Sequence, residues 1–300
     1  MASISMTTAR KRKGVKSAKA GRTLQTVQIY EADGQEVKYG GNPRFSLEMT
    51  TIHSDIIRIL FETLKEILQD VNIIFTQQGI KITHMDNSQT VLVHLTLVAD
   101  QIRSDGGYYF CEAPRTVGVN MGTFYKLIKT VSKEDVISFF IDREDKNHLC
   151  IKIENKNKNI TTVLKYKVYD IDQQEISIIE NIDNETIFTM PSSEFQKYVK
   201  DMYNLSDVLE ITIVGNQVTF SCDGDWASQK TIINSESPPA ATDEVIQGKF
   251  SLQHLQSFTK ATNLCINTNI LLKNNFPLIV QYPIPSLGIL RFLLSQRENT

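Results

Sequence analysis

The sequence has few cysteines and no long hydrophobic run, and these absences exclude several classes of protein. Its four cysteines, Cys111, Cys150, Cys222 and Cys265, lie far apart and form no Cys-x-x-Cys pair. This spacing fits neither a disulfide framework nor a zinc site, so we expect reduced thiols in an intracellular protein. No run of roughly eighteen apolar residues is present, and the first residues carry charge where a signal peptide has its apolar region. We therefore expect a soluble protein that is not secreted.

The common catalytic motifs are also missing. The chain has no GxxxxGK[ST] loop, no GxSxG elbow, no HExxH and no GxGxxG. Its histidines, His53, His84, His94, His148 and His254, stand singly, which is typical of polar or core residues and not of metal ligands. We therefore expect no catalytic residue, no metal and no cofactor.

One group of acidic residues leaves an alternative open. A two-metal DNA-processing enzyme would need clustered carboxylates, and the candidates are Asp142, Glu144, Asp145, Asp170 and Asp172. However, IDREDKN has the composition of a hairpin tip and YDID that of a linker. Solvated surface acids are therefore the favoured interpretation.

The length and charge of the chain suggest two domains and a basic arm. With 300 residues, 41% of them hydrophobic and 22% charged, the chain has ordinary globular composition and exceeds the usual size of one core. Residues 1–22 contain seven basic residues and no acid, which gives them a charge of +7. Because the net charge of the whole chain is −2, residues 23–300 carry a charge of about −9. Any contact with nucleic acid must therefore come from a local basic patch or from the basic arm. The arm could instead serve as a nuclear localisation signal or as a solubilising tail.

The order of expected elements occurs twice along the chain. Residues 23–43 read as a linker or a short appended strand pair, and from Phe45 a strand, an amphipathic helix capped at Ser54-Asp55, several strands, a second helix in MGTFYKLIKTV and three more strands follow. TIFTMPSSEFQKYVKDMY, LEITIVGNQVTFSCDGD and QGKFSLQHLQSFTKA repeat this order. We predict an α+β fold with an N-terminal extension (1–44), domain 1 (45–167), a connecting loop (168–186) and domain 2 (187–300).

Basic residues recur on the four predicted helices. Each pair alone is also typical of a solvated helix face, but recurrence on four equivalent helices favours a positive stripe that grips phosphates and not bases. The stripe residues are Arg58, Lys65, Lys126, Lys129, Lys197, Lys200 and Lys260.

Several segments together resemble one family. THMDNSQTVLVHLTL, GVNMGTFYKLIKTVSKEDVISF, YKVYDIDQQEISI, MPSSEFQKYVKDM, FTKAT and FPLIVQY with LGILRFLL are similar to segments of proliferating cell nuclear antigen, the eukaryotic-type DNA sliding clamp. The resemblance covers about Phe45 to Gln296, whereas residues 1–44 and the ENKNKN hairpin have no counterpart in the family. It implies the clamp fold: two domains with two helices each, assembled as a homotrimeric ring whose helices line a hole around duplex DNA.

The resemblance also implies function and partners. A clamp is not an enzyme; it is a processivity factor for DNA polymerase and a docking platform for replication and repair proteins, opened by an ATP-driven loader. No membrane partner is expected, and the location would be the nucleus or an intracellular viral replication site. A monomeric or inactive clamp-like adaptor remains the second alternative.

The resemblance assigns further residues to sites. The implied pocket for short aromatic and aliphatic client peptides comprises Met85, Gln89, Val168, Ile171, Ile176, Ile178, Pro277, Leu293 and Ser295. The implied subunit interface, between strands near 161–167 and 228–234, includes Leu164, Tyr166 and Ile232. Gln89 and Leu293 replace a histidine and a tyrosine of the family, which alters partner preference, and Gly215 replaces a modifiable lysine, which removes a ubiquitin switch at that position.

Overall fold

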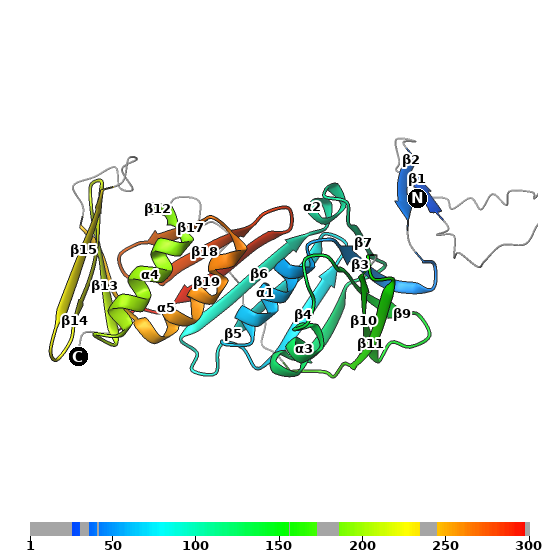
Figure 1. The fold of residues 1–300 in the computed structure, drawn as a ribbon, viewed down its shortest axis with the longest axis horizontal. Coiled ribbons are helices and arrows are strands. Elements are labelled where there is room, and N and C mark those ends of the chain that lie inside the picture. Colours follow the sequence, from blue (N-terminus) through cyan, green and yellow to red (C-terminus); the bar gives the residue numbers. More distant parts are fainter. Residues whose placement is uncertain are drawn as a thin grey trace, which may run out of the picture.

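The chain folds into antiparallel sheets covered by one layer of helices (Figure 1). The computed structural model describes residues 26–30, 36–40, 42–155, 157–172, 186–234 and 245–297. The elements up to the connecting loop are β1 (Thr26–Tyr30), β2 (Glu36–Gly40), β3 (Phe45–Thr51), α1 (Ser54–Leu64), β4 (Asp70–Thr76), β5 (Gly79–Met85), β6 (Val91–Val98), α2 (Ala99–Ser104), β7 (Tyr108–Cys111), β8 (Arg115–Asn120), α3 (Met121–Ile128), β9 (Val136–Asp142), β10 (His148–Asn155) and β11 (Ile160–Lys167). Those after it are β12 (Thr186–Pro191), α4 (Ser192–Tyr203), β13 (Val208–Val214), β14 (Gln217–Asp223), β15 (Ser228–Asn234), β16 (Ile246–Ser251), α5 (Leu252–Phe258), the 3-10 helix η1 (Thr259–Leu264), β17 (Asn267–Leu272), β18 (Leu278–Ile284) and β19 (Gly288–Leu294).

The second half of the chain repeats the strand order of the first. The order β11-β10-β9-β3 in one sheet has the same topology as β19-β18-β17-β12, and β6-β5-β4-β8 has the same topology as β15-β14-β13-β16. The internal repeat predicted from the sequence is therefore confirmed. The first repeat adds α2 and β7, which the sequence analysis missed, and it is preceded by the hairpin of β1 and β2, one of the two interpretations of residues 23–43.

One eight-stranded sheet runs through both repeats. Its order is β12-β17-β18-β19-β6-β5-β4-β8, so four strands come from each repeat. The two sets meet where β19 pairs with β6, from Gly288 opposite Leu97 to Leu294 opposite Val91. Backbone hydrogen bonds thus join the repeats into one sheet. The domain limits at 167 and 187 stay a prediction, with β11 ending at Lys167 and β12 beginning at Thr186.

Residue alternation explains which side of this sheet faces the helices. In β6 the sequence VLVHLTLV places a buried residue at every second position, beginning at Val91, with half-buried residues between them. Successive side chains of a strand point to opposite faces, so one face is the core side and the other is the outer face. The alternation predicted from the sequence therefore determines which face of the sheet is turned toward the helices.

The helices α1, α3, α4 and α5 lie on the same face of the sheet (Figure 1). Helix α1 contacts α3 and η1, and α4 contacts α5 and η1, so they form one continuous layer across both repeats. None of the helices in the described ranges is long and apolar enough to cross a membrane. The buried helix residues recur at spacings of three and four, as in Ile57, Leu60 and Leu64 of α1 and Phe195, Val199 and Met202 of α4.

The start of α1 differs from the sequence prediction. The N-cap is His53, and Ser54 is the first helical residue. The Ser54 hydroxyl is buried and is close enough to donate to the carbonyls of Ser132 at 2.8 Å and Asp135 at 2.6 Å. Ser54 therefore does not cap its own helix; it fastens the helix to the turn before β9. The helix also ends earlier than its periodicity indicates, with Lys65 as its C-cap.

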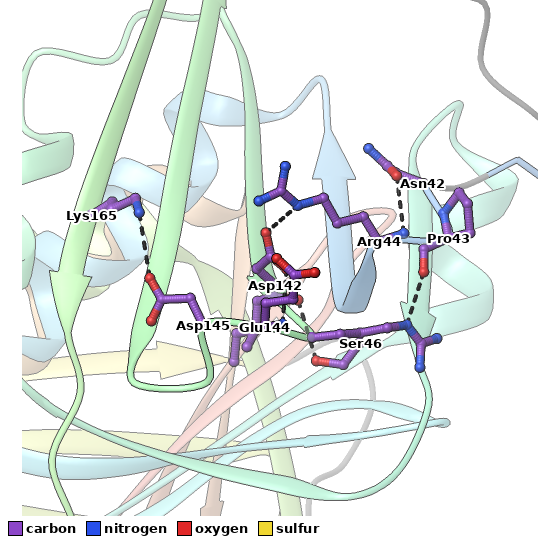
Figure 2. A network of polar contacts seen from close by, with 10 residues as sticks. Asn42, Pro43, Arg44, Ser46, Asp142, Glu144, Asp145 and Lys165 are labelled. Carbon is purple, nitrogen blue, oxygen red and sulfur yellow. Dashed lines mark hydrogen bonds and ion pairs between the residues drawn. The ribbon is translucent and has the colours of Figure 1, made fainter.

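A polar network fixes the point at which the chain enters β3 (Figure 2). The Arg44 guanidinium donates to the Asp142 carboxylate at 2.5 Å. Arg143 donates to the carbonyl of Pro43 at 2.9 Å and pairs with Glu112 at 2.6 Å. These contacts hold residues 43 and 44 against the hairpin between β9 and β10, so the N-terminal extension leaves the body at a fixed place.

The centre of the joined sheet generates a stability prediction. Phe292 of β19 is fully buried, with its ring stacked on Phe258 at 4.4 Å and edge-on to Tyr282 at 6.1 Å between centroids. Phe292→Ala should lower the free energy of unfolding by about 3–5 kcal/mol, because it removes apolar contacts and leaves a cavity. Denaturant unfolding at fixed protein concentration measures this. Ile266→Ala, at a residue 85% exposed, is the control and should stay within about 0.5 kcal/mol of wild type; equal losses would contradict the role of Phe292.

Candidate nucleic-acid interface

Five lysines lie exposed along the helix layer. Two are at the end of α3, two are on α4 and one is in η1: Lys126, Lys129, Lys197, Lys200 and Lys260. Within the described ranges no ion pair neutralises any of them. The spacing of three residues in each pair places both ammonium groups on one side of the helix axis. The layer thus carries free positive charge in both repeats.

Helix α1, in the middle of the layer, is different. Arg58 is half-buried and pairs with Glu62 at 3.3 Å, and Lys65 donates to Glu66 while its ammonium lies 5.0 Å from the ring centre of Tyr125. Burial, with the Glu62 charge beside it, raises the pKa of the Tyr125 hydroxyl, which therefore stays neutral near pH 7. The seven predicted stripe residues are therefore not equivalent, because two of them share their charge with neighbouring acids.

The layer is suited to weak contacts with a polyanion. Exposed ammonium groups on long side chains reach phosphate oxygens as point charges and carry no pattern that distinguishes one base from another. Acids are interspersed on the same helices, including exposed Glu194 and Asp201 beside the two lysines of α4. This mixture limits the attraction at any one place.

The outer face of the sheet carries an apolar row. Met85 of β5 pairs with Leu92 of β6, Leu92 with Leu293 of β19, and Leu293 with Ile279 of β18. Residues directly opposite in antiparallel strands point to the same face, here the one away from the helices. The sequence analysis named Met85 and Leu293 but missed Leu92 and Ile279. The alternation of VLVHLTLV was a signal that Leu92 faces outward. That Leu92 lies beside Leu293 follows only from the pairing of β6 with β19 between the repeats.

A tight turn borders this row between β5 and β6. Gln89 is exposed and has a left-handed backbone with φ of 56°. The Asp86 carboxylate accepts hydrogen bonds from the backbone N–H groups of Thr90 and Val91, both at 2.8 Å. Partial burial acts to raise the pKa of Asp86, but the Ser88 hydroxyl and these backbone donors outweigh it and hold the pKa below its ordinary value. The ionised carboxylate therefore fixes the shape of the turn.

The first residues of the connecting loop lie on the outer face of β8 and β4. Asn72 of β4 donates its side-chain amide to the carbonyl of Ile171 at 2.8 Å. A side chain at Gly118 of β8 would come within 2.1 Å of the Tyr169 carbonyl, so glycine permits this close approach. Val168 is half-buried and packs against the core.

Of the remaining predicted pocket residues, the structure describes Pro277 and Ser295 but not Ile176 and Ile178. Pro277 and Ser295 are exposed at the ends of β18 and β19, and the Ser295 N–H donates to the Thr90 carbonyl at 3.0 Å. Ile176 and Ile178 lie outside the described residues. The structure thus brings Met85, Leu293 and Ser295 to one end of the outer face beside the Gln89 turn, and the roles of all these residues stay predictions.

Among the described strands that end a sheet, β11 and β15 occupy the places that β19 and β6 have in the other repeat, but each is paired on one side only. β11 is the last strand of a five-stranded sheet and β15 the last strand of a four-stranded sheet. On β11, Leu164 packs on the core, and Tyr166 is buried with its hydroxyl accepting from the Asn120 N–H at 2.9 Å. The side chains of these two predicted interface residues therefore face their own domain. The exposed apolar residues of the two strands include Ile232, as predicted for the interface, and Val163, which was not named, at 50% and 53% exposure.

Two acids of the metal-site alternative have structural partners, and a third, Glu144, is exposed. Asp142 is held by Arg44, and Asp145 pairs with Lys165 at 3.4 Å (Figure 2). Asp145 also pairs with His148 at 2.8 Å. Asp170 and Asp172 are exposed in the connecting loop. Among the residues that the structure describes, no group of three or more His, Cys, Asp or Glu side chains is placed to hold a metal ion.

Comparison with known proteins identifies the family. Residues 46–176 match "Proliferating cell nuclear antigen, N-terminal domain", and residues 178–297 match "Proliferating cell nuclear antigen, C-terminal domain". The chain is also 35% identical over 252 residues to a protein of Paramecium bursaria Chlorella virus 1 described as "Probable DNA polymerase sliding clamp 1". That match covers 82% of this chain and 94% of the viral protein. The chain therefore belongs to the proliferating cell nuclear antigen family of DNA sliding clamps.

Proposed function

We propose that this sliding clamp works as a homotrimeric ring around duplex DNA, with its helix layer facing the DNA and its outer face holding client proteins. The ring would serve DNA polymerase and other replication and repair proteins. The observation that carries the proposal is the pair of unsatisfied edge strands, β11 and β15, which occupy equivalent positions to the paired strands β19 and β6.

The internal repeat supports this proposal, because it contains a pairing of the equivalent strands. β11 has the place in the first repeat that β19 has in the second, and β15 has the place in the second that β6 has in the first. Within the chain β19 pairs antiparallel with β6. The same pairing between β11 of one subunit and β15 of the next would continue the sheet from subunit to subunit. A contact of this head-to-tail kind produces a closed ring when the rotation between subunits closes.

Topology then supplies the function. A closed ring cannot leave duplex DNA by releasing contacts one at a time, so weak phosphate contacts from the lysines of the helix layer permit sliding without dissociation. Opening a seam breaks a whole strand pairing, which is the task of a separate ATP-driven loader. The protein would act wherever the DNA is replicated, in the nucleus or at an intracellular viral replication site.

The outer face provides the docking site. The half-buried residues of the apolar row, Met85, Leu92 and Leu293, form a floor next to buried Ile279, and the connecting loop with Ile171 forms one wall. Aromatic and aliphatic anchors of a short peptide would bury this surface, while Gln89 and Ser295 offer hydrogen bonds at the rim. Exposed Asp170 and Asp172 favour clients with flanking basic residues.

Assembly is tested first. Light scattering at micromolar concentration should give three times the chain mass of 34.1 kDa. Val163→Lys should yield monomers, because the seam would bury an unpaired ammonium group at a residue that is exposed in the single chain. Val214→Lys, at another exposed valine, should leave the trimer intact. A monomeric wild type would favour the adaptor alternative and sink the ring proposal.

DNA binding is tested by salt dependence. Lys126→Glu combined with Lys200→Glu should flatten the plot of log affinity against log salt by about 0.9 for each phosphate that the variant no longer neutralises. Fluorescence anisotropy with duplexes of different sequence measures the slope and should show little base preference. Lys81→Glu, at an exposed lysine of β5, is the matched control. If the double variant keeps the wild-type slope, the helix layer does not contact the DNA. Deletion of residues 1–22 would then test whether the basic arm makes the contacts instead.

Client binding is tested with a fluorescent peptide of the form Q-x-x-aliphatic-x-x-aromatic-aromatic. Leu92→Ala and Leu293→Ala should each raise its Kd about tenfold, because both remove apolar surface from the floor. Ile289→Ala, two pairs away on the same face of β19, should leave the Kd unchanged. Equal affinity in all four proteins would show that clients dock elsewhere.

A further inference from the structure

Trp226 is an unusually exposed residue for its type. It is the single tryptophan of the chain, and its side chain is 75% exposed. It lies in the turn between β14 and β15, where the Gly224 N–H donates to the Ala227 carbonyl at 3.1 Å. Tryptophan in an exposed turn has no folding role there, and such residues are enriched in interfaces. Its position directly before the open strand β15 points to the seam between subunits.

The internal repeat fixes the place of each β15 residue relative to β6. In the first repeat, Thr76 pairs with Gly79 at the turn between β4 and β5, and Gly79 pairs with Val98 of β6. In the second repeat, Val214 pairs with Gln217 at the turn between β13 and β14, and Gln217 pairs with Asn234 of β15. Asn234 therefore has the place of Val98. Counting back along both strands, Gln229 has the place of Val93 and Trp226 that of Thr90.

The ladders of the other sheet fix β11 relative to β19. The starting points are Met49 of β3 and Phe188 of β12, because each is the last buried residue but one of the strand that precedes the first long helix of its repeat. Following the register partners through three ladders gives Met49, Phe139, Ile151 and Leu164 in the first repeat and Phe188, Ile270, Val280 and Phe292 in the second. Leu164 therefore has the place of Phe292, and Lys167 that of Ser295.

These equivalences give the register of the seam. Within the chain Phe292 pairs with Val93, so Leu164 of one subunit faces Gln229 of the next. Three residues further on, the Ser295 N–H donates to the Thr90 carbonyl at 3.0 Å, which marks the end of that pairing. The equivalent residues at the end of the seam are Lys167 and Trp226.

We propose that Trp226 of one subunit packs over Lys167 of the next and closes the end of each seam. The inference rests on the proposed ring, and it assigns to this exposed tryptophan a second copy of the chain as its partner. An ammonium group over the indole face within about 6 Å gains a cation–π attraction in addition to the buried apolar area. Lys167 is exposed and has no ion pair among the described residues, whereas Lys165 on the same side of β11 already pairs with Asp145.

The sole tryptophan makes the proposal directly measurable. Its emission should shift to the blue and its quenching by acrylamide should fall when the trimer forms, and both changes should be absent in the monomeric Val163→Lys variant. Trp226→Ala should raise the concentration at which the trimer dissociates by about tenfold. Lys167→Ala should weaken the trimer as well, and the double variant should be weakened by less than the product of the two single effects, because both substitutions remove the same interaction.

The controls separate this inference from the ring itself. Ile266→Ala, which removes an exposed apolar residue remote from β15 in the sequence, should leave trimer dissociation unchanged. If the wild type is a trimer but its tryptophan emission matches that of Val163→Lys, the Trp226 contact is overturned and the ring stands. Additive effects of Trp226→Ala and Lys167→Ala would also overturn the pairing. If the wild type is monomeric, the ring proposal fails first.

Discussion

The pairing of β19 with β6 is the interaction on which the rest of this structure depends. These strands belong to different repeats, and their backbone hydrogen bonds convert two four-stranded sheets into one sheet of eight strands. An open strand edge is a template for pairing, and at this junction the second repeat supplies β19 and the first supplies β6. One such junction is satisfied within the chain. The other leaves β11 and β15 open, and this imbalance is the physical reason to expect assembly.

The joined sheet also separates two kinds of chemistry. Because strand side chains alternate between faces, one side buries apolar residues under the helices and the other carries the apolar row around Leu92 and Leu293. The helices in turn present lysines on the side away from the sheet. The DNA surface and the docking site that we propose therefore lie on opposite faces of one layer, so DNA and an apolar peptide would not compete for the same residues.

Much of the fold was predictable because its signals are local. Alternation in VLVHLTLV and the three- and four-residue spacing in α1 and α4 predicted the elements, and the repeated order predicted the two halves, which the structure confirms. Features that depend on distant partners were not predictable. Ser54 resembles a helix cap, but its hydroxyl bonds to Ser132, which no local pattern reveals.

The candidate sites show the same division. The cations were found by their recurrence, but the sequence analysis overlooked Glu62, which stands four residues after Arg58 and pairs with it on the same helix. The apolar row was half found, because Leu92 and Leu293 become neighbours only through the pairing of the two repeats. Tyr166 was assigned to the interface from its strand, whereas its side chain is buried in its own domain. For the apolar row and for Tyr166, the missing information is strand register, because a shift of one residue turns every side chain of a strand to the other face.

The central claim is that β11 of one subunit pairs antiparallel with β15 of the next in the register of β19 and β6. In that register Thr162 faces Thr231, as Leu290 faces Leu95 within the chain. The most direct measurement is oxidation of a Thr162→Cys, Thr231→Cys variant followed by denaturing electrophoresis without reductant. The account predicts covalent species that stop at three chains, whereas Thr162→Cys alone and Thr231→Cys alone, like the wild type with its four native cysteines, form none. A ladder that extends beyond three chains, or the absence of cross-links in a protein that sediments as a trimer, would contradict it.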